Sequence, residues 1–206
     1  HRIFRIAGSD HASRMLLPEL SRSLIELGSS IRLVWVPPGA WSLADHLHRG
    51  ELDLAVVARI QVPRDIETQV LYQDEYVYVV RKGHPQACQP VTLDSFCAVP
   101  QIFLGYGTST FDDLIDQTLA RAGRHRLAQI AVTSFGQIVH HLLHSDHAAV
   151  LGARVAREYA DVLHARPLPF ALPPYQSLLC WDARSATDQG VQWLKERITA
   201  ILAQDV

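Results

Sequence analysis

Apolar and polar positions along this chain switch repeatedly from strand-like runs to helical spacing, which predicts strands followed by helices. The first switch comes at Gly8, where a short apolar run over residues 3–7 ends. Ser9 and Asp10 follow, and both residue types cap helix N-termini. Open α/β sheets bind small ligands where a helix begins beyond a strand end, so this segment indicates a small-molecule site. Leucines at helical intervals mark the buried face that we predict for this helix: Leu17, Leu20, Leu24 and Leu27.

This alternation continues along the rest of the chain. Further strands are predicted over residues 31–36, 52–57, 68–81 (as one or two strands), 99–104, 128–132, 148–151, 163–167 and 177–181. Helices are predicted over residues 40–48, 92–96, 153–159 and 188–202, with two more that end at Arg121 and Leu143. Strands that alternate with helices are typical of α/β sheets with right-handed crossovers.

Two segments rich in turn-forming residues, 81–85 and 173–177, are the predicted boundaries within the chain. If the chain crosses between two lobes at both points, residues 1–81 and 177–206 form lobe I, and residues 82–176 form lobe II. A cleft is then expected between the two lobes.

Composition narrows the class of protein. With 206 residues, 48% of them hydrophobic and 19% charged, the chain can bury a globular core. Its formal net charge of −2 argues against a dedicated nucleic-acid surface, because such surfaces show a basic excess. Three cysteines without a C-x-x-C pair fit a reducing compartment. No apolar run reaches the roughly 18 residues of a membrane helix, and no signal peptide is evident. The chain starts inside a strand pattern, as a piece of a longer protein would.

Histidines are the first candidate for chemistry. His140, His141, His144 and His147 lie close together, and His140 and His144 are one helical turn apart, which can support a metal site. There is no H-E-x-x-H motif, and no cysteine or acidic residue is evident as a third ligand. We therefore expect solvated or core-edge histidines and no metal.

Enzymatic catalysis is the second candidate, and no assembled signature supports it. The chain has no G-x-S-x-G elbow, and its cysteines lack a catalytic context. It also has no G-x-G-x-x-G or P-loop motif that would hold a nucleotide phosphate. We therefore predict a protein that is not an enzyme, with no catalytic residues and no cofactor.

Capped turns are the third candidate. Three of them follow a predicted strand and open a predicted helix. Capping alone explains each turn and contributes about 1 kcal/mol. Three such helix starts can also converge on one cleft and offer hydroxyl and N–H groups to a polar or carboxylate ligand. The residues are Ser9 and Asp10 in the first turn, Thr108, Ser109 and Thr110 in the second, and Thr133 and Ser134 in the third.

Two aromatic residues and one arginine lie next to these turns. Phe103 and Phe135 can stack on a ligand ring or belong to the core. Arg59 follows the predicted strand over residues 52–57 and can pair with a ligand carboxylate or remain solvated.

Four stretches taken together resemble the effector-binding domain of LysR-type transcriptional regulators. They are FRIAGSDHASRMLLPEL, GELDLAVV, EYVYVVRKGHP and LLCWDAR…WLKERI, and the resemblance covers essentially all 206 residues. Within that family the chain is most similar to the branch of nodulation and aromatic-catabolism regulators. That branch shows R-K-x-H-P, here residues 81–85, and F-W-H-x-R/K, here residues 180–184.

The resemblance implies a type II periplasmic-binding-protein-like α/β fold of two Rossmann-like lobes, with an effector bound in the inter-lobe cleft. It implies effector contacts from Ser9 and Asp10, from the region after residues 52–57, from Phe103 and from the two later capped turns. Two departures stand out. Ser134 occupies a position that is often histidine in salicylate-responsive relatives, which argues against assuming a salicylate-type effector. Asp182 replaces the histidine of the W-H pair.

We therefore expect the sensor domain of a cytoplasmic transcription regulator that binds a small, aromatic or carboxylate-bearing effector. The resemblance implies a homodimer of this domain, a tetramer of the full-length protein, and DNA contact only through an N-terminal winged helix-turn-helix absent from this chain. No membrane contact is expected. The alternative on the same fold is an extracytoplasmic solute-binding protein of a transporter, and a metalloenzyme built on the histidine cluster is a third.

Overall fold

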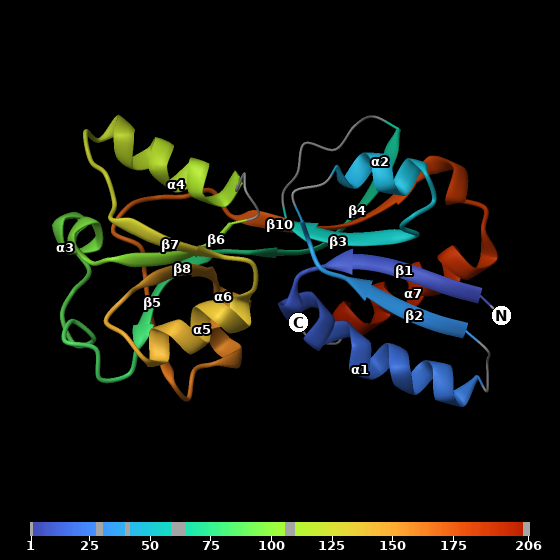
Figure 1. The fold of residues 1–206 in the computed structure, drawn as a ribbon, viewed down its shortest axis with the longest axis horizontal. Helices are drawn as coiled ribbons and strands as arrows, with labels where there is room; N and C mark the ends of the chain where they lie inside the picture. The colour runs from blue at the N-terminus through green and yellow to red at the C-terminus, as the bar shows by residue number, and fades with distance from the viewer. Residues whose placement is uncertain (1, 28–30, 40–41, 59–64, 106–109, 204–206) are drawn as a thin grey trace. The chain divides into compact units, whose positions relative to one another are not determined.

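The computed structural model describes residues 2–27, 31–39, 42–58, 65–105 and 110–203 (Figure 1). The chain forms two compact units. Unit 1 comprises His1–Gln73 and Gln176–Val206, and unit 2 comprises Asp74–Tyr175. The first boundary differs from the one expected after Arg81, because β5 (Tyr76–Arg81) hydrogen-bonds to β8 (Ala149–Gly152) and β9 (Leu163–Arg166) of unit 2.

Unit 1 is built on a five-stranded sheet with the order β2-β1-β3-β10-β4. The strands β1 (Arg2–Gly8), β2 (Ile31–Val36) and β3 (Leu54–Ala58) are parallel. On its other side β3 pairs antiparallel with β10 (Tyr175–Asp182), and β4 (Ile66–Asp74) lies at the edge. The apolar strand expected over residues 52–57 is thus paired on both sides, in parallel on one side only.

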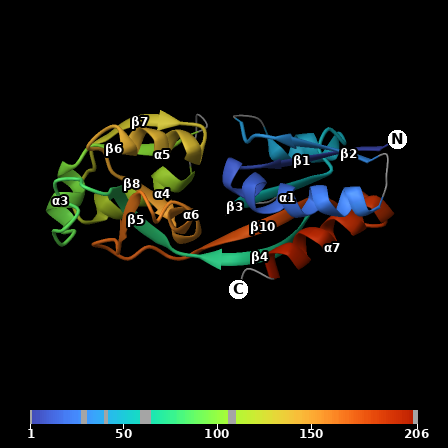
Figure 2. The same ribbon diagram turned by 90° about the horizontal axis from the view of Figure 1, so that it is seen from below.

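Helices cover both faces of this sheet. On one face α1 (Asp10–Glu26) and α7 (Gln189–Ala203) lie side by side and bury Phe4 and Leu194 among other core residues (Figure 2). On the other face the short helix α2 (Leu43–His48) buries Leu47 against the sheet. A single 3₁₀ turn, η1 (Ala183–Ser185), follows β10.

The buried face of α1 differs from the predicted one. Ala12, Leu16 and Leu20 are buried at four-residue spacing, whereas Leu27 is 53% exposed. The helix carries two overlapping apolar stripes that share Leu20, and spacing alone does not say which one faces the sheet. In the structure the stripe of Ala12, Leu16 and Leu20 faces the core of unit 1.

Unit 2 contains a three-stranded sheet, β8-β5-β9, and a parallel pair, β6 (Gln101–Leu104) with β7 (Ala128–Val132). A parallel bridge between Gln101 and Ala148 joins β6 to the chain entering β8. The helices α5 (Phe135–Leu143) and α6 (Ala153–Glu158) cover one face, and α3 (Leu93–Ala98) and α4 (Thr110–Arg121) cover the other. The strand predicted over residues 68–81 is two strands, β4 and β5, which belong to different units.

Candidate functional site

Each unit contains the same β-α-β-α-β series. It runs β1-α1-β2-α2-β3 in unit 1 and β6-α4-β7-α5-β8 in unit 2. In both units the first strand lies between the second and the third, and the two helices pack on opposite faces. Such a reversal of strand order is a topological switch point, and open α/β sheets bind ligands beyond the carboxyl ends of the strands there. Each unit therefore has one switch point, and the positions of the candidate residues are given relative to it.

In unit 1, Ser9 and Asp10 follow the carboxyl end of β1 and are half-buried. Ser9 is the N-cap of α1, as predicted, and its Oγ accepts a hydrogen bond from the Ala12 N–H at 3.1 Å. The Asp10 carboxylate pairs with Arg14 at 3.1 Å. Arg59, expected beside them, lies outside the described residues, because β3 is described only to Ala58.

The β1 end is closely covered by β2. Trp35 Nε1 donates to the Gly8 carbonyl oxygen at 2.9 Å. A Cβ at Gly8 would lie 2.5 Å from the Trp35 ring, so only glycine allows this approach. The indole therefore fixes the turn from which Ser9 opens the helix.

In unit 2, Thr133 and Ser134 follow β7 and open α5. Ser134 is the N-cap, as predicted, and its Oγ accepts a hydrogen bond from the Gln137 N–H at 3.2 Å. The Thr133 N–H donates to Gln137 Oε1 at 3.0 Å, which closes the turn. Phe135, the first residue of α5, is partly buried against the core cluster of this face.

Phe103 lies on β6, next to β7 in the sheet. Because side chains alternate along a strand, Phe103 faces the α4 side of the sheet, while its neighbours Ile102 and Leu104 contact the α5 side. The Arg126 guanidinium lies 5.5 Å from its ring centroid. Phe103 and Phe135 are thus on opposite faces and do not form one aromatic wall.

The remaining predicted turn is only partly described. Thr108 and Ser109 lie outside the described residues. Thr110 is the first residue of α4, and the structure describes its backbone but not its side-chain environment.

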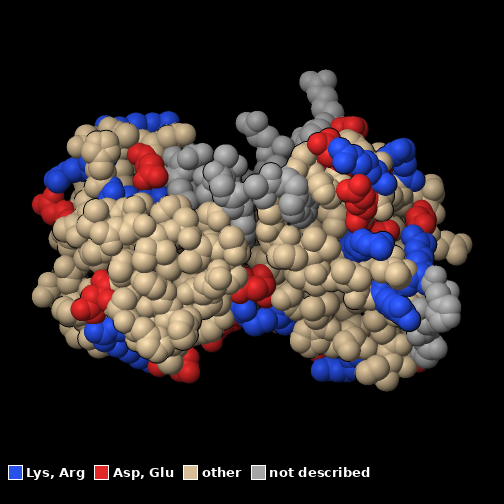
Figure 3. All heavy atoms as spheres, viewed as in Figure 1, with Lys and Arg blue, Asp and Glu red and all other residues tan. Residues whose placement is uncertain are grey.

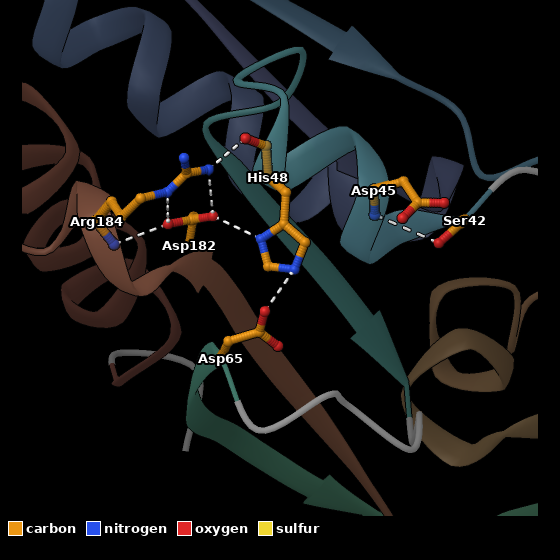
Figure 4. A network of polar contacts seen from close by, with 6 residues as sticks. All are labelled: Ser42, Asp45, His48, Asp65, Asp182 and Arg184. Atoms are coloured by element: carbon orange, nitrogen blue, oxygen red, sulfur yellow. Dashed lines mark hydrogen bonds and ion pairs between the residues drawn. The ribbon is translucent and has the colours of Figure 1, made fainter.

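A charged network in unit 1 was not expected from the sequence beyond the departure at Asp182 (Figure 4). The buried Asp182 carboxylate accepts hydrogen bonds from His48 Nδ1 at 2.7 Å and from Arg184 Nε and Nη2, both at 2.9 Å. His48 Nε2 lies 2.9 Å from the Asp65 carboxylate. These side chains and Ala183 line a cavity of about 310 Å³.

The network has a clear electrostatic consequence. Hydrogen bonding from Arg184, with a further contribution from His48, holds the pKa of Asp182 well below its ordinary range, against the opposing effect of burial. The carboxylate is therefore ionised across the physiological pH range. Since His48, Asp65 and Asp182 come from α2, the start of β4 and the end of β10, the network joins three parts of unit 1.

The described residues were compared with two further kinds of site, a metal centre and a nucleic-acid surface. Among the described residues, no group of three or more His, Cys, Asp and Glu side chains is arranged to hold a metal ion. Figure 3 shows acidic and basic side chains mixed on the face in view, without a broad area of Lys and Arg. Over the described part of the chain, no helix is long and apolar enough to cross a membrane.

The decisive comparison is with protein families. Residues 1–203 match the family model described as the LysR substrate binding domain. The chain belongs to this family. The family and its relatives are transcriptional regulators, not enzymes, so the absence of an assembled catalytic signature in the sequence agrees with it.

Curated relatives are similar over nearly the whole domain. The chain is 26% identical to the transcriptional activator NagR of Ralstonia sp, over 98% of this chain and 68% of the relative. It is 24% identical to Nodulation protein D 1 of Rhizobium tropici and 27% identical to the activator NahR of Pseudomonas putida, covering 94% and 95% of this chain and 63% and 65% of those proteins. The chain thus spans about two thirds of the length of these relatives.

Solved structures show the same fold. The regulatory domain of MexT, a transcriptional activator in Pseudomonas aeruginosa, superposes with a TM-score of 0.81 at 24% identity, covering 97% of this chain and 99% of that one. The effector binding domain of QuiR in complex with shikimate superposes with a TM-score of 0.78 at 17% identity, over 99% of this chain and 98% of that one. The family and the two-unit α/β fold expected from the sequence are therefore confirmed.

Proposed function

We propose that this LysR-type domain senses a small aromatic or carboxylate-bearing effector, bound between its two lobes. The observation that carries the proposal is the repeated switch point, with a capped helix opening at Ser9 in unit 1 and at Ser134 in unit 2. Each helix start offers N–H groups and a positive dipole end to an anionic group. The QuiR domain, whose fold is similar, holds shikimate, a small carboxylate.

The proposed contacts are those expected from the sequence. Ser9 and Asp10 contribute from unit 1, together with Arg59. Unit 2 contributes Phe103, the turn Thr108–Thr110, and Thr133, Ser134 and Phe135. No bond is made or broken in this mechanism. The effector acts by binding one arrangement of lobes or subunits more tightly than another, since a ligand with equal affinity for both shifts nothing.

In the full-length protein, we propose that the effector-driven change alters DNA binding through an N-terminal winged helix-turn-helix outside this chain. We also propose a cytoplasmic homodimer of this domain and a tetramer of the whole protein. Exposed apolar side chains at the carboxyl end of α1 support self-association: Ile25 is 76% exposed and Leu27 is 53% exposed. Val34, which is also exposed, lies on the edge strand β2, and edge strands offer backbone groups to another chain.

The rival proposal is a solute-binding protein of a transporter on the same fold. The relatives favour the regulator, because NagR and NahR are transcriptional activators. The sequence upstream of His1 separates the two. A helix-turn-helix supports the regulator, and a signal peptide followed directly by this domain would overturn it.

A thermal-shift screen of benzoate, salicylate, shikimate and flavonoid-type compounds tests the effector class. A ligand at 100 times its dissociation constant stabilises the domain by about 2.7 kcal/mol. Ser134→Ala and Phe103→Ala should each weaken binding of a hit. Thr92→Ala is the matched control, because Thr92 caps α3 in the same way as Ser134 caps α5 but lies away from the switch point. Equal affinities in the parent and both site variants would refute this placement of the site.

A further inference from the structure

Two histidines at the carboxyl end of α5 form a hydrogen bond with each other. His141 Nε2 lies 3.3 Å from His147 Nδ1, with the ring planes at 74°. Both residues are half-buried. A ring nitrogen accepts a hydrogen bond only while it carries no proton, so this bond depends on how many protons the two rings hold. We call His141 and His147 the histidine pair.

The neighbours of the histidine pair fix the direction of this bond. His147 Nε2 lies 3.2 Å from Gln129 Oε1, which only accepts, so Nε2 carries the proton of the neutral ring. His147 Nδ1 then holds a lone pair. The Ser145 hydroxyl lies 3.1 Å from that atom, but it donates its proton to the His141 carbonyl oxygen at 2.9 Å. The donor to His147 Nδ1 is therefore His141 Nε2.

The bond tolerates one added proton and not two. A protonated His141 still donates from Nε2 to the lone pair of His147 Nδ1. When both rings are protonated, two N–H groups face each other and two positive charges lie close together. Burial, and after it the neighbouring His141, lower the pKa of His147. The closed pair therefore disfavours the second proton.

Charged groups on the neighbouring elements offset the second proton only in part. The Asp146 carboxylate acts in the favourable direction, but it is 59% exposed and pairs with Arg81 Nη2 at 2.7 Å. His84 Nε2 lies 3.1 Å from the Asp146 carbonyl oxygen, and so contacts the same segment from the β5 side. His140 and His144 stack on the same helix end with their ring centroids 4.5 Å apart, and bring no negative charge.

We propose that the histidine pair is a pH-sensitive contact, which holds residues 145–147 against the end of α5 until both rings are protonated and then releases them. The released segment leads into β8, and α5 is the helix that begins at the Ser134 turn. This inference goes beyond the proposed function and does not depend on any effector.

The pH at which the contact is lost has a defined sign. The pKa of His147 is lower in the folded chain than its ordinary value of 6.5. The contact therefore contributes fully above that value and is lost as the pH falls below it, because the open pair takes up one more proton than the closed pair.

Amide exchange of the untagged chain, followed by NMR at pH 7.5 and pH 5.5 and corrected for the intrinsic effect of pH, tests the contact. The reporters are the His144 N–H, which donates to the His141 carbonyl oxygen at 3.1 Å, and the His147 N–H, which donates to Ser145 Oγ at 3.4 Å. Uptake of one proton on opening should lower their protection by up to about tenfold at pH 5.5, one unit below 6.5. Protection at the fully buried Phe4 in unit 1 should not change.

His141→Gln is the informative variant. Its amide carries both an N–H donor and an oxygen acceptor and takes up no proton in this pH range, so the contact should persist at both pH values. The loss of protection at pH 5.5 should then disappear. His140→Gln/His144→Gln is the matched control, since it removes two histidines from the same helix end outside the pair and should keep the loss.

A direct measurement on the parent chain completes the test. In ¹⁵N spectra of the histidine rings, the loss of protection should follow uptake of the second proton by the pair, which decides the matter even if His141→Gln fails to fold. Unchanged protection in the parent at pH 5.5, an equal loss in a folded His141→Gln variant, or no loss in the control variant would overturn the proposal. A simultaneous loss at Phe4 would also overturn it, because the whole chain would then be unfolding.

Discussion

Replacing Asp182 by Asn tests whether the charged network holds unit 1 together. The amide keeps the size of the side chain and can still accept through one atom. It cannot accept at the second position, where His48 Nδ1 and Arg184 Nη2 donate to the carboxylate. The charge that draws both donors is also removed.

The expected loss of stability in Asp182→Asn depends on how exposed the side chains are that contact Asp182. The Arg184 side chain is 73% exposed, so solvent screens its contact with Asp182 and that contact contributes little to stability. The bond from His48 reaches a side chain that is nearly buried, and a hydrogen bond to a charged group there contributes about 1.5–3 kcal/mol. Asp182→Asn should therefore cost about 2–3 kcal/mol. For a chain of this size that lowers Tm by about 5–10 °C.

The pH dependence has a defined sign. The pKa of Asp182 is lower in the folded state than its ordinary value of 3.8, so its stabilising contribution is complete above that value. It is lost as the pH falls through the folded pKa. The difference between parent and variant that depends on the Asp182 charge should be present at pH 5 and shrink below about pH 4.

Tryptophan fluorescence during urea unfolding measures the difference in stability between parent and variant, and it reports on unit 1. All four tryptophans, Trp35, Trp41, Trp181 and Trp193, belong to unit 1, so the signal reports that unit alone. Asp45→Asn is the control, because Asp45 lies exposed on the same short helix as His48, and its loss should cost under about 1 kcal/mol. A parent-like midpoint in Asp182→Asn, or a difference that stays the same at pH 3, would refute the reasoning.

Three further predictions concern buried contacts. Gly190→Ala should destabilise unit 1 by about 1–3 kcal/mol by tryptophan fluorescence, because the new Cβ would lie 2.4 Å from the ring of the fully buried Phe4; an unchanged midpoint would contradict this. Tyr175→Phe should cost about 1–3 kcal/mol, seen as faster amide exchange around Arg154, because it removes the buried hydroxyl that donates to Asp74 at 2.9 Å; parent-like exchange would argue against it. Burial raises the pKa of Cys180 to about 12. Iodoacetamide at pH 8 should therefore label the exposed Cys88 and leave Cys180 unmodified until urea unfolds the chain. Rapid labelling of Cys180 in the native chain would show that its burial is transient.

Local signals explain what the sequence predicted well. The strand over Ile31–Val36 has the predicted bounds, and Ser9, Thr92 and Ser134 cap the helices that follow them. Each of these features depends on residues within a few positions of one another, so periodicity and capping preference suffice.

Features that depend on distant partners were missed. His48 and Asp182 are 134 positions apart, and no spacing rule connects them. The boundary after Gln73 is set by the pairing of β5 with β8 and β9, which a continuous apolar stretch does not reveal. Even the short-range contact between His141 and His147, whose Nε2 and Nδ1 atoms lie 3.3 Å apart, depends on where the chain turns after α5, and helical spacing does not reveal it.

Strand direction separates the Asp182 network from the proposed effector site. Gly8 pairs with Val56 on β3, and Cys180 pairs with Ala55 on the same strand. Because β10 is antiparallel to β3, Asp182 lies beside residue 53 at the amino end of β3. Gly8 lies beside Val56, so the two levels are three residues, or about 10 Å, apart along β3. The departure from the W-H pair should therefore change the stability of unit 1 and leave effector choice unaffected.

For any hit of the thermal-shift screen, Asp182→Asn should lower Tm yet bind the compound as tightly as the parent, measured below the variant's Tm. A selective loss of affinity in this variant would place Asp182 in the effector site and contradict the argument from strand register.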